Sequence, residues 1–403
     1  MFDTQVLIVG AGPAGTAAAI RLARDGRDVT IVDKATFPRD KCCGDGLTAG
    51  ALRLLDDLGF RPSSVPSWKA VDAAWVRSPD GREVRFPLPE GQGTFIAVAP
   101  RRELDAALVD LARSEGVKVH DGHGFRSITA HEHDHIRVEV DGLGEVRSRY
   151  VIAADGMWSP VRKSLGVAEP GYLGEWHAFR QYIGNVTGPA AERLYVWFDA
   201  DLLPGYAWSF PLPGGRANVG FGIARGGSLR VQQMKALWPD LLARPHVREA
   251  LGEAAVPEAR HLAWPIPARV DTAVLARGRV LLAGDAACAT DPLTGEGIAQ
   301  ALLTGVLAAE AIVGAGALRP EVARARYVDT VRAELLADHR MSTFLGKVLV
   351  HPHGARGAIA MADANDWTRR NFARWLFEDE PRAAALTPRR WHRGFLRRPG
   401  AFA

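Results

Sequence analysis

The feature that most constrains this chain is a glycine-rich turn between an apolar strand and a helix near the N-terminus. Residues 5–9 read Gln-Val-Leu-Ile-Val, a short apolar run of the kind that a parallel strand buried on both faces requires. The turn at residues 10–15 has the pattern GxGxxG, and an alanine-rich helix pattern follows over residues 13–24. A second apolar strand at residues 28–32 ends in Asp33. Together these features predict a βαβ unit.

A βαβ unit with this turn is typical of dinucleotide binding. Gly10 permits the tight turn, Gly12 lets the backbone approach a pyrophosphate, and Gly15 lets the helix pack closely on the strands. The helix N-terminus offers unpaired N–H groups to the phosphates. A carboxylate at Asp33 accepts hydrogen bonds from a ribose and repels a 2′-phosphate, which favours FAD or NAD over NADP. The candidate residues for this half of the cofactor are Gly10, Gly12, Pro13, Ala14, Gly15, Asp33 and Lys34.

Three further segments place acids and glycines where open α/β sheets bind ligands. A strand at residues 150–154 ends in Asp155 and Gly156, and a strand at residues 279–283 ends in Gly284 and Asp285. Ligands bind outside the carboxyl ends of such strands, so both pairs are candidate cofactor residues. The third segment is a proline and glycine turn that opens a long apolar helix, and its N-terminus predicts a second anion-stabilising site. Its candidate residues are Pro292, Gly295, Gly297 and Ile298.

Length and composition exclude several classes of protein. The 403 residues exceed what one hydrophobic core fills, and 47% hydrophobic with 24% charged residues is typical of globular domains. The composition excludes a disordered, collagen-like or disulfide-stapled chain. Fifty basic residues against 46 acidic residues give a net charge of only +4, so no nucleic-acid partner is expected. The apolar stretch Ile298–Leu318 contains polar residues and is expected to be a buried helix.

The predicted fold class is α/β, with a Rossmann-type domain interrupted by an antiparallel β-sheet domain and followed by a helical C-terminal region. Alternating and aromatic segments between the Rossmann elements predict the antiparallel sheet. The predicted boundaries are 1–70, 99–170 and 266–318 for the dinucleotide domain, 71–98 and 171–265 for the sheet domain, and 319–403 for the helical region.

The motifs occur in the order seen in flavoprotein monooxygenases of the hydroxybenzoate hydroxylase fold, over most of the chain up to about residue 315. Residues 41–48 (KCCGDGLT) and 204–211 (PGYAWSFP) also resemble hallmark motifs of the geranylgeranyl reductase family, and residues 292–298 are similar to its flavin loop. The resemblance implies that the bound dinucleotide is FAD. It implies that Arg101 contacts the central region of the cofactor and that Asp285 contacts its ribityl or pyrophosphate portion. It places Gly295 to Ile298 at the pyrimidine edge of the isoalloxazine.

Cys43, Tyr206 and Trp208 are the candidate catalytic residues. Cys43 is a candidate proton donor or substrate gate at the flavin face, and the alternative is a small buried residue in a tight loop. Cys42 is interpreted as structural. Tyr206 and Trp208 alternate on a strand and therefore share one face, where they could line an apolar tunnel or simply pack in a core.

The resemblance implies an FAD-dependent oxidoreductase that acts on an apolar isoprenoid or natural-product substrate, most simply by reducing isolated C=C bonds. The alternative is a flavin monooxygenase that hydroxylates or epoxidises, and the less favoured readings are a flavin halogenase and a non-catalytic flavin-binding protein. Halogenases of this fold need a lysine beside the substrate, and Lys69 is the only candidate. Only one GxGxxG follows a strand, so electrons are expected from a visiting NAD(P)H or from a reductase or ferredoxin.

Two other clusters are candidates for binding roles. His131 to His135 contains three histidines, but the segment is polar and is interpreted as a solvated hairpin, so no metal site is predicted. The basic tail could place Trp391 and Phe395 against an anionic lipid surface, with a solvated helix end as the alternative. Its arginines are Arg389, Arg390, Arg393, Arg397 and Arg398. A cytoplasmic location with peripheral membrane contact through this tail is the corresponding expectation.

Overall fold

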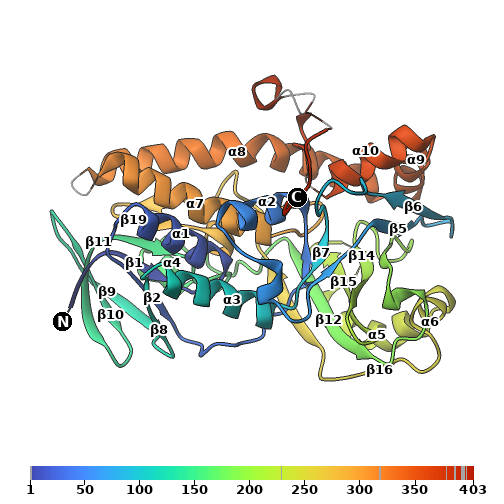
Figure 1. Cartoon of the computed structure of the whole chain (residues 1–403), viewed down its shortest axis with the longest axis horizontal. Helices are drawn as coiled ribbons and strands as arrows, with labels where there is room; N and C mark the ends of the chain where they lie inside the picture. The colour runs from blue at the N-terminus through green and yellow to red at the C-terminus, as the bar shows by residue number, and fades with distance from the viewer. Residues whose placement is uncertain are drawn as a thin grey trace.

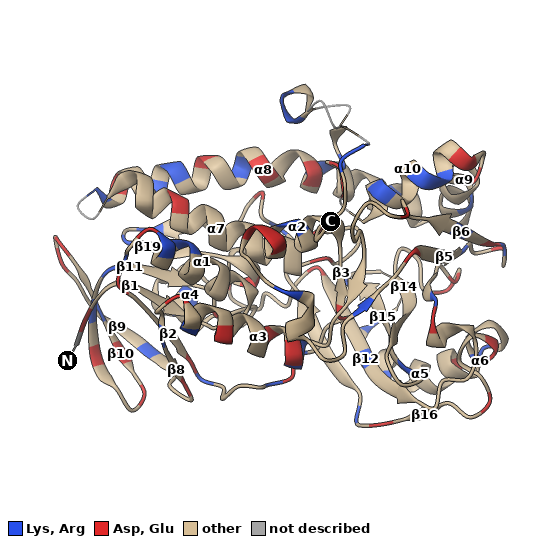
Figure 2. Ribbon diagram, viewed as in Figure 1, with Lys and Arg blue, Asp and Glu red and all other residues tan. Residues whose placement is uncertain are grey.

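The computed structural model of the chain describes residues 2–227, 229–316, 319–377, 379–384, 387–391, 395 and 397–403. Two large sheets lie side by side, and long helices from the C-terminal part of the chain run across one edge of both (Figure 1). Acidic and basic residues are interspersed over most of the ribbon (Figure 2). The predicted fold class is confirmed by this arrangement.

The first sheet has the order β18-β19-β11-β1-β2-β8, with β9 and β10 attached to β11 as a hairpin. The pairs β1–β2, β1–β11, β2–β8 and β11–β19 are parallel. The half of β1 nearest the glycine turn, Val6 to Val9, is apolar and buried because helices cover both faces, as parallel sheets require. The strands are β1 (Phe2–Val9), β2 (Val29–Asp33), β8 (Lys118–Asp121), β9 (Phe125–His131), β10 (Ile136–Val140), β11 (Gly144–Ala153), β18 (Ala276–Arg277) and β19 (Val280–Leu282).

Helices α1 (Pro13–Arg24), α3 (Arg101–Ser114) and α7 (Ile298–Ala315) pack around this sheet. The N-terminal end of α1 touches α7 closely, because a Cβ at Gly305 would lie 2.1 Å from the carbonyl oxygen of Ala14. Helix α7 is long and apolar enough to cross a membrane, but 72% of it is buried inside the fold. The described structure therefore uses it as a core helix, as the sequence predicts. Two shorter helices are α2 (Ala49–Asp57) and α4 (Pro160–Ser164).

The second sheet has the order β16-β12-β15-β14-β13-β5-β6, with β17 paired to β12. Most neighbouring strands are antiparallel, and β13–β5 is a parallel pair. Trp238 of α5 packs on one face of the sheet against Phe179 and Phe221. The elements are β5 (Ala73–Arg77), β6 (Glu83–Pro87), β12 (Trp176–Gly184), β13 (Leu194–Trp197), β14 (Tyr206–Leu212), β15 (Arg216–Ala224), β16 (Val256–Pro257), β17 (Leu262–Ile266), α5 (Met234–Ala243) and α6 (Pro245–Leu251).

A separate three-stranded sheet has the order β3-β7-β4, with β3 at Gly46–Leu47, β7 at Ala97–Val98 and β4 at Lys69–Ala70. The C-terminal helices are α8 (Pro320–Leu349), α9 (Pro352–Ala362) and α10 (Asp366–Leu376), and α10 packs on β6. Short 3-10 turns occur at Pro62–Ser64, Pro189–Ala191, Val231–Gln233, Gly284–Ala287 and Pro388–Arg390.

Within the predicted helical region, α helix ends at Leu376, and the described residues after α10 form only a 3-10 turn and irregular segments. Ala401 instead pairs with Thr94 in an isolated bridge. The segment His131 to His135 forms the predicted hairpin connection between β9 and β10, but it is not solvated throughout: His135 is buried and contacts Asp134 at 2.6 Å and Glu132 at 3.3 Å.

Candidate functional site

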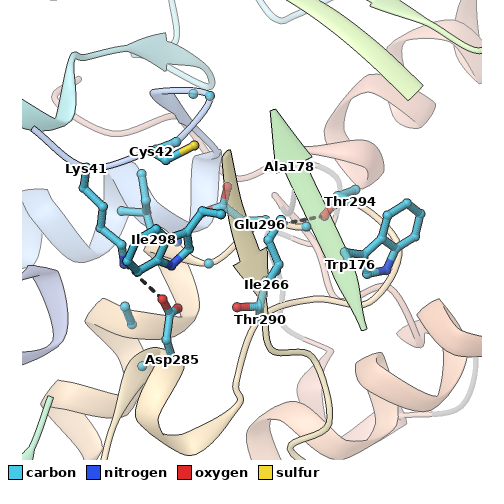
Figure 3. Close-up of a pocket in the computed structure, with 18 of the residues that line it drawn as sticks. Lys41, Cys42, Trp176, Ala178, Ile266, Asp285, Thr290, Thr294, Glu296 and Ile298 are labelled. Carbon is cyan, nitrogen blue, oxygen red and sulfur yellow. Dashed lines mark hydrogen bonds and ion pairs between the residues drawn. The ribbon is translucent and has the colours of Figure 1, made fainter. Parts of the chain in front are cut away.

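A single cavity of about 810 Å³ runs from the glycine turn of the first sheet to the C-terminal helices. It is lined by every residue that the sequence predicts for the site except Gly15 and Pro292. The carbonyl of Pro292 accepts a hydrogen bond from the Trp176 indole at 2.9 Å, so this residue positions a side chain that does line the cavity. Figure 3 shows Lys41 and Asp285 on one side of the site and Trp176 with Thr294 on the other.

The three glycines of the turn have different surroundings. Gly10 has φ +104°, and a Cβ there would lie 2.3 Å from the carbonyl oxygen of Ala154. A Cβ at Gly15 would lie 1.9 Å from the carbonyl oxygen of Gly10, so this glycine serves helix packing. The space in front of Gly12 is open, because an added Cβ would meet only Nη2 of Arg39 at 3.6 Å. The structure therefore leaves room for a ligand at Gly12 alone.

The groups around this space fit the ADP half of FAD. Helix α1 begins at Pro13 with no side chain capping its first N–H groups, as phosphate binding requires. Both oxygens of Asp33, at the end of β2, are fixed by backbone N–H groups of Ala11 and Ala35 at 2.8 Å. The carboxylate is thereby oriented towards the cavity, with lone pairs left for ribose hydroxyls. Lys34 is exposed at the rim beside it.

Asp155 and Gly156 line the cavity after β11. One oxygen of Asp155 accepts from the N–H of Val161 at 3.0 Å, and its other oxygen, Oδ1, is buried with no partner among the described residues. Burial raises the pKa of this carboxyl to about 6, although bonds from Ser159 and Val161 oppose the rise. An unsatisfied buried acceptor beside an open glycine is expected where a ligand completes the site.

Gly284 and Asp285 follow β19 on the opposite wall. Gly284 has φ +60°, and its N–H donates to the Thr304 hydroxyl at 2.9 Å. Asp285 pairs with Lys41 at 3.0 Å, so the carboxylate that resemblance assigns to the cofactor also holds a lysine in the cavity. Sequence reasoning missed Lys41, because a pair 244 residues apart in sequence has no local signal.

The loop before α7 is held by Asp291. One oxygen of its carboxylate accepts from the backbone N–H groups of Leu293 and Thr294, and the other accepts from Ser342 at 2.6 Å. Arg382 pairs with it at 3.4 Å. Burial alone would raise the pKa of Asp291, but Arg382 and these hydrogen bonds lower it. The C-terminal segment thus fixes the loop that lines the cavity.

At the N-terminus of α7, where the sequence predicts an anion-stabilising site, the structure places an acid. The Glu296 carboxylate lines the cavity and accepts from the backbone N–H groups of Ile298 and Ala299, each at 2.9 Å. Its negative charge offsets the positive end of the helix dipole. Sequence reasoning considered the glycines of this loop and overlooked the acid between them.

Replacing Glu296 with glutamine is expected to raise the reduction potential of bound FAD. The change removes a negative charge that disfavours a reduced, anionic cofactor, and the expected gain is equivalent to about 1 kcal/mol. Dye-equilibrated potentiometry measures it. Glu310→Gln, which lies on the same helix but pairs with Arg21 at its exposed side, is the matched control. A potential that falls or stays unchanged would remove Glu296 from the flavin environment.

The loop that contains Cys43 packs directly on the aromatic strand β14. A Cβ at Gly46 would lie 2.8 Å from the Phe210 ring, and one at Gly44 would lie 3.4 Å from the Trp208 indole nitrogen. These two glycines therefore let the loop approach the strand, and the two hallmark motifs form one unit. Cys42 also lines the cavity, which its structural interpretation did not anticipate.

Cys43 is held between Arg101 and the backbone of Asp45. The positive charge of Arg101 acts on the thiol, and the N–H of Asp45 donates to the sulfur at 3.4 Å. Arg101 is itself oriented by a bidentate pair with Asp105 at 2.7 and 2.8 Å. Burial raises the pKa of the Cys43 thiol, although Arg101 opposes the rise. The group is therefore protonated at neutral pH.

Tyr206 and Trp208 both face the cavity, as their alternation on β14 predicts. The Tyr206 hydroxyl donates to the carbonyl of Thr294 in the loop before α7. The Trp208 indole donates to the amide oxygen of Asn218 at 3.2 Å. The aromatic strand is thus connected at one end to the cofactor loop and at the other to the polar groups behind Cys43.

Asp45 is the centre of those polar groups and was not predicted as a site residue. It has φ +66° and is completely buried. Its Oδ2 accepts from the Tyr182 hydroxyl and from the Asn218 amide, both at 2.7 Å, and its Oδ1 accepts from the N–H of Arg101 at 3.2 Å. Burial raises its pKa to about 6, against the opposing effect of Tyr182 and Asn218.

Asp45 is expected to make folding stability fall as pH rises. Its pKa is 3.8 in an exposed carboxyl and about 6 here, so the folded state holds the proton more tightly over that interval. Stability falls by about 3 kcal/mol between about pH 4 and pH 6, and the Asp45→Asn variant lacks this contribution. Urea unfolding across this range measures the difference, with the exposed Asp110→Asn as control. Equal pH slopes for the wild type and Asp45→Asn would contradict the assignment.

Lys69 does not serve the role that a halogenase requires. Its ammonium donates to the carbonyl of Ala191 at 2.9 Å and pairs with Glu192 at 2.6 Å, and it does not line the cavity.

Comparison with known proteins agrees with this geometry. A family model described as an FAD binding domain matches residues 3–310. The chain belongs to this family. A menaquinone reductase of Mycolicibacterium smegmatis is 34% identical over 333 residues, which cover 77% of each chain. A digeranylgeranylglycerophospholipid reductase of Methanopyrus kandleri is 33% identical over 313 residues, which cover 76% of each chain.

This flavoprotein is therefore an FAD-dependent oxidoreductase of the geranylgeranyl reductase type. Among solved structures, a geranylgeranyl bacteriochlorophyll reductase-like protein of Thermoplasma acidophilum superposes with a TM-score of 0.78 at 20% identity, covering 97% of this chain and all of that chain. The flavin-dependent halogenase CmlS superposes with a TM-score of 0.69 at 25% identity, covering 98% of this chain and 74% of that chain. Proteins that catalyse different reactions thus share this fold, so the reaction must be inferred from the side chains of the site.

Proposed function

We propose that this flavoprotein saturates isolated C=C bonds in the prenyl chain of a lipid. The observation that carries the proposal is that one cavity contains both a protonated thiol, Cys43, and a long apolar chamber beyond the aromatic strand β14. The reductases that resemble it act on menaquinone and on a digeranylgeranylglycerophospholipid, which both carry isoprenoid chains. A flexible apolar substrate fits a chamber of this kind.

The chamber lies between the second sheet and the helices α8 to α10. One wall comes from β5 and β13, and the facing wall comes from the C-terminal helices. Representative lining residues are Val76, Leu194, Val196, Ile359, Phe372 and Leu376. Burial of apolar carbon contributes about 0.8 kcal/mol per methylene, so such a chamber binds prenyl units without polar recognition.

The reaction needs a hydride for one carbon of the double bond and a proton for the other. When bound, FAD supplies the electrons as the hydride. The thiol of Cys43 supplies the proton, because burial keeps it protonated until a substrate carbon accepts the charge. Arg101 then stabilises the thiolate that remains, since its positive charge favours the ionised sulfur. Tyr206 and Trp208 hold the chain against this group.

We propose that the electrons come from NAD(P)H or from a reductase or ferredoxin that visits the site. The single glycine-rich turn is assigned to the adenosine half of FAD, which leaves no second fold-level site in the sequence for a nicotinamide cofactor. Anaerobic mixing with NADH, NADPH or reduced ferredoxin distinguishes these donors by the rate at which the yellow colour is lost.

The test of the proposed function is an anaerobic assay of the photoreduced protein with a prenylated quinone in detergent. Mass spectrometry should show that the product has gained hydrogen and no oxygen. A product that contains labelled oxygen after exposure to ¹⁸O₂ would make the protein a monooxygenase, and recovery of unchanged prenyl lipids would leave it a flavin-binding protein without this activity.

A further inference from the structure

Exposed apolar side chains gather at the end of α8 and on the helices that follow it. Five of the eleven large exposed hydrophobic residues among the described part of the chain lie between residues 344 and 367. The exposed fractions are 61% for Phe344, 73% for Met361 and 61% for Trp367. The other two are Val348 and Val350. We call these five residues the α8–α10 apolar face.

This face meets the substrate chamber at Val348. Val348 is 39% exposed to solvent and also lines the cavity, and its neighbours Leu345 and Leu349 line the cavity from the same helix end. Ala358 of α9 and Trp375 of α10 complete this part of the wall. The chamber therefore reaches the surface beside the exposed apolar side chains. Single exposed apolar residues are normal on protein surfaces, but a group of them next to an apolar chamber indicates a binding surface.

The charge around the face is positive. The 24 residues from 339 to 362 contain Arg340, Lys347 and Arg356 and no acid. Neither Arg340 nor Lys347 has an ion pair with a described residue. Helix α10 adds Arg370, and its basic residues are visible in Figure 2.

The acids that follow on α9 and α10 do not cancel this charge. Asp363 is buried and pairs with Arg82 and Arg369, and Asp366 pairs with Arg369 at 2.9 Å. The face therefore presents apolar groups among uncompensated cations, which is the pattern of proteins that bind anionic membrane surfaces.

We propose that the α8–α10 apolar face docks on a bilayer that contains anionic phospholipid and that the prenyl lipid passes between bilayer and chamber beside Val348. The proposal rests on the proposed function in that the substrate is a lipid. A second copy of the chain fits the face less well, since a two-fold interface would bring together two faces that each carry unpaired cations, and residues 339–362 contain no acid to compensate them.

The docking surface differs from the tail that the sequence suggested. Arg390 pairs with Asp338 at 2.8 Å, and the carbonyl of Arg398 accepts from Arg374 at 2.8 Å. The described part of the tail is thus tied to the body of the protein, and Arg393 lies outside the described residues.

Vesicle sedimentation of the full-length holoprotein tests the proposal. We expect binding to vesicles of equimolar phosphatidylcholine and phosphatidylglycerol, weaker binding to phosphatidylcholine alone, and loss of binding at high salt. The double variant Phe344→Ser, Trp367→Ser should bind the mixed vesicles at least about tenfold more weakly. The double variant Arg340→Glu, Lys347→Glu should lose the preference for anionic lipid. Leu173→Ser, an exposed apolar residue elsewhere, is the matched control and should bind as the wild type does.

Two further measurements separate the outcomes. Reduction of a detergent-dispersed prenyl quinone should be unchanged in these variants, because none of the substituted residues lines the cavity. Wild-type protein that binds mixed vesicles but does not reduce the prenyl quinone would overturn the proposed function and not the docking surface. Wild-type protein that ignores mixed vesicles, or variants that bind them normally, would overturn the docking surface. So would sedimentation velocity showing that Phe344→Ser, Trp367→Ser converts a dimer to a monomer, since the face would then join two copies.

Discussion

Replacing Gly12 with valine is expected to give folded but colourless protein. An added side chain at this position meets open space within the fold, because the nearest contact of a Cβ is Arg39 at 3.6 Å. It does fill the place where the backbone must approach the pyrophosphate. We expect the affinity for FAD to fall at least about 100-fold, equivalent to about 2.7 kcal/mol. Visible absorbance after purification and titration calorimetry measure the loss, and circular dichroism checks the fold.

Two other glycines provide the controls for Gly12→Val. Gly15→Val should fail to fold, because its Cβ would lie 1.9 Å from a backbone carbonyl. Gly357→Val should purify fully yellow, because Gly357 lies on α9 with no atom within 4 Å of an added Cβ. Full FAD occupancy in Gly12→Val would show that the glycine turn does not hold the cofactor.

Local patterns were sufficient to predict the cofactor half of this molecule. The turn at residues 10–15 and the acid at position 33 lie within one βαβ unit, where chain geometry leaves few alternatives. Helix α1 spans Pro13–Arg24 as the sequence predicts, and Asp33 ends β2. The same reasoning places Asp155 and Asp285 at strand ends, because the carboxyl ends of parallel strands share one edge of the sheet.

Contacts between distant segments could not be predicted in this way. Asp45 is surrounded by Tyr182, Asn218 and Arg101, which lie 56 to 173 residues away in the sequence. Periodicity reports which face of a strand is buried but not which loop packs there. The capping role of Glu296 could not be predicted for a different reason. Acids are common at helix N-termini, and the sequence does not show whether the carboxylate accepts from the first N–H groups of the helix.

Replacing Cys43 with alanine is expected to abolish most of the C=C reduction while sparing the reduction of bound FAD. Removing a positioned general acid costs about 100-fold to 10,000-fold in rate. The thiol is the proton source in the proposed reaction, and nothing in its contacts with Arg101 and Asp45 links it to the entry of electrons. Single-turnover assays with photoreduced enzyme measure the second step separately from the first.

Cys42→Ala is the matched control, because this neighbouring thiol also lines the cavity and the change in volume is the same. Burial raises the pKa of Cys42 to about 12, but Arg180 rather than Arg101 is the cation that opposes the rise. The proposed proton donor is Cys43 and not its neighbour, so Cys42→Ala should retain nearly full activity.

The comparison of the two variants also decides between saturation and oxygen transfer. A monooxygenase needs a dry pocket and no proton donor at the substrate carbon, so it would treat Cys43→Ala and Cys42→Ala alike and incorporate ¹⁸O into product. A reductase should lose activity in Cys43→Ala alone, form its product without oxygen, and regain part of the rate in Cys43→Ser, whose hydroxyl is a weaker acid at the same place. Equal loss in both alanine variants would instead mean that the Cys42–Cys43 loop acts by packing on Phe210 and Trp208, and the proton would have to come from water admitted to the chamber.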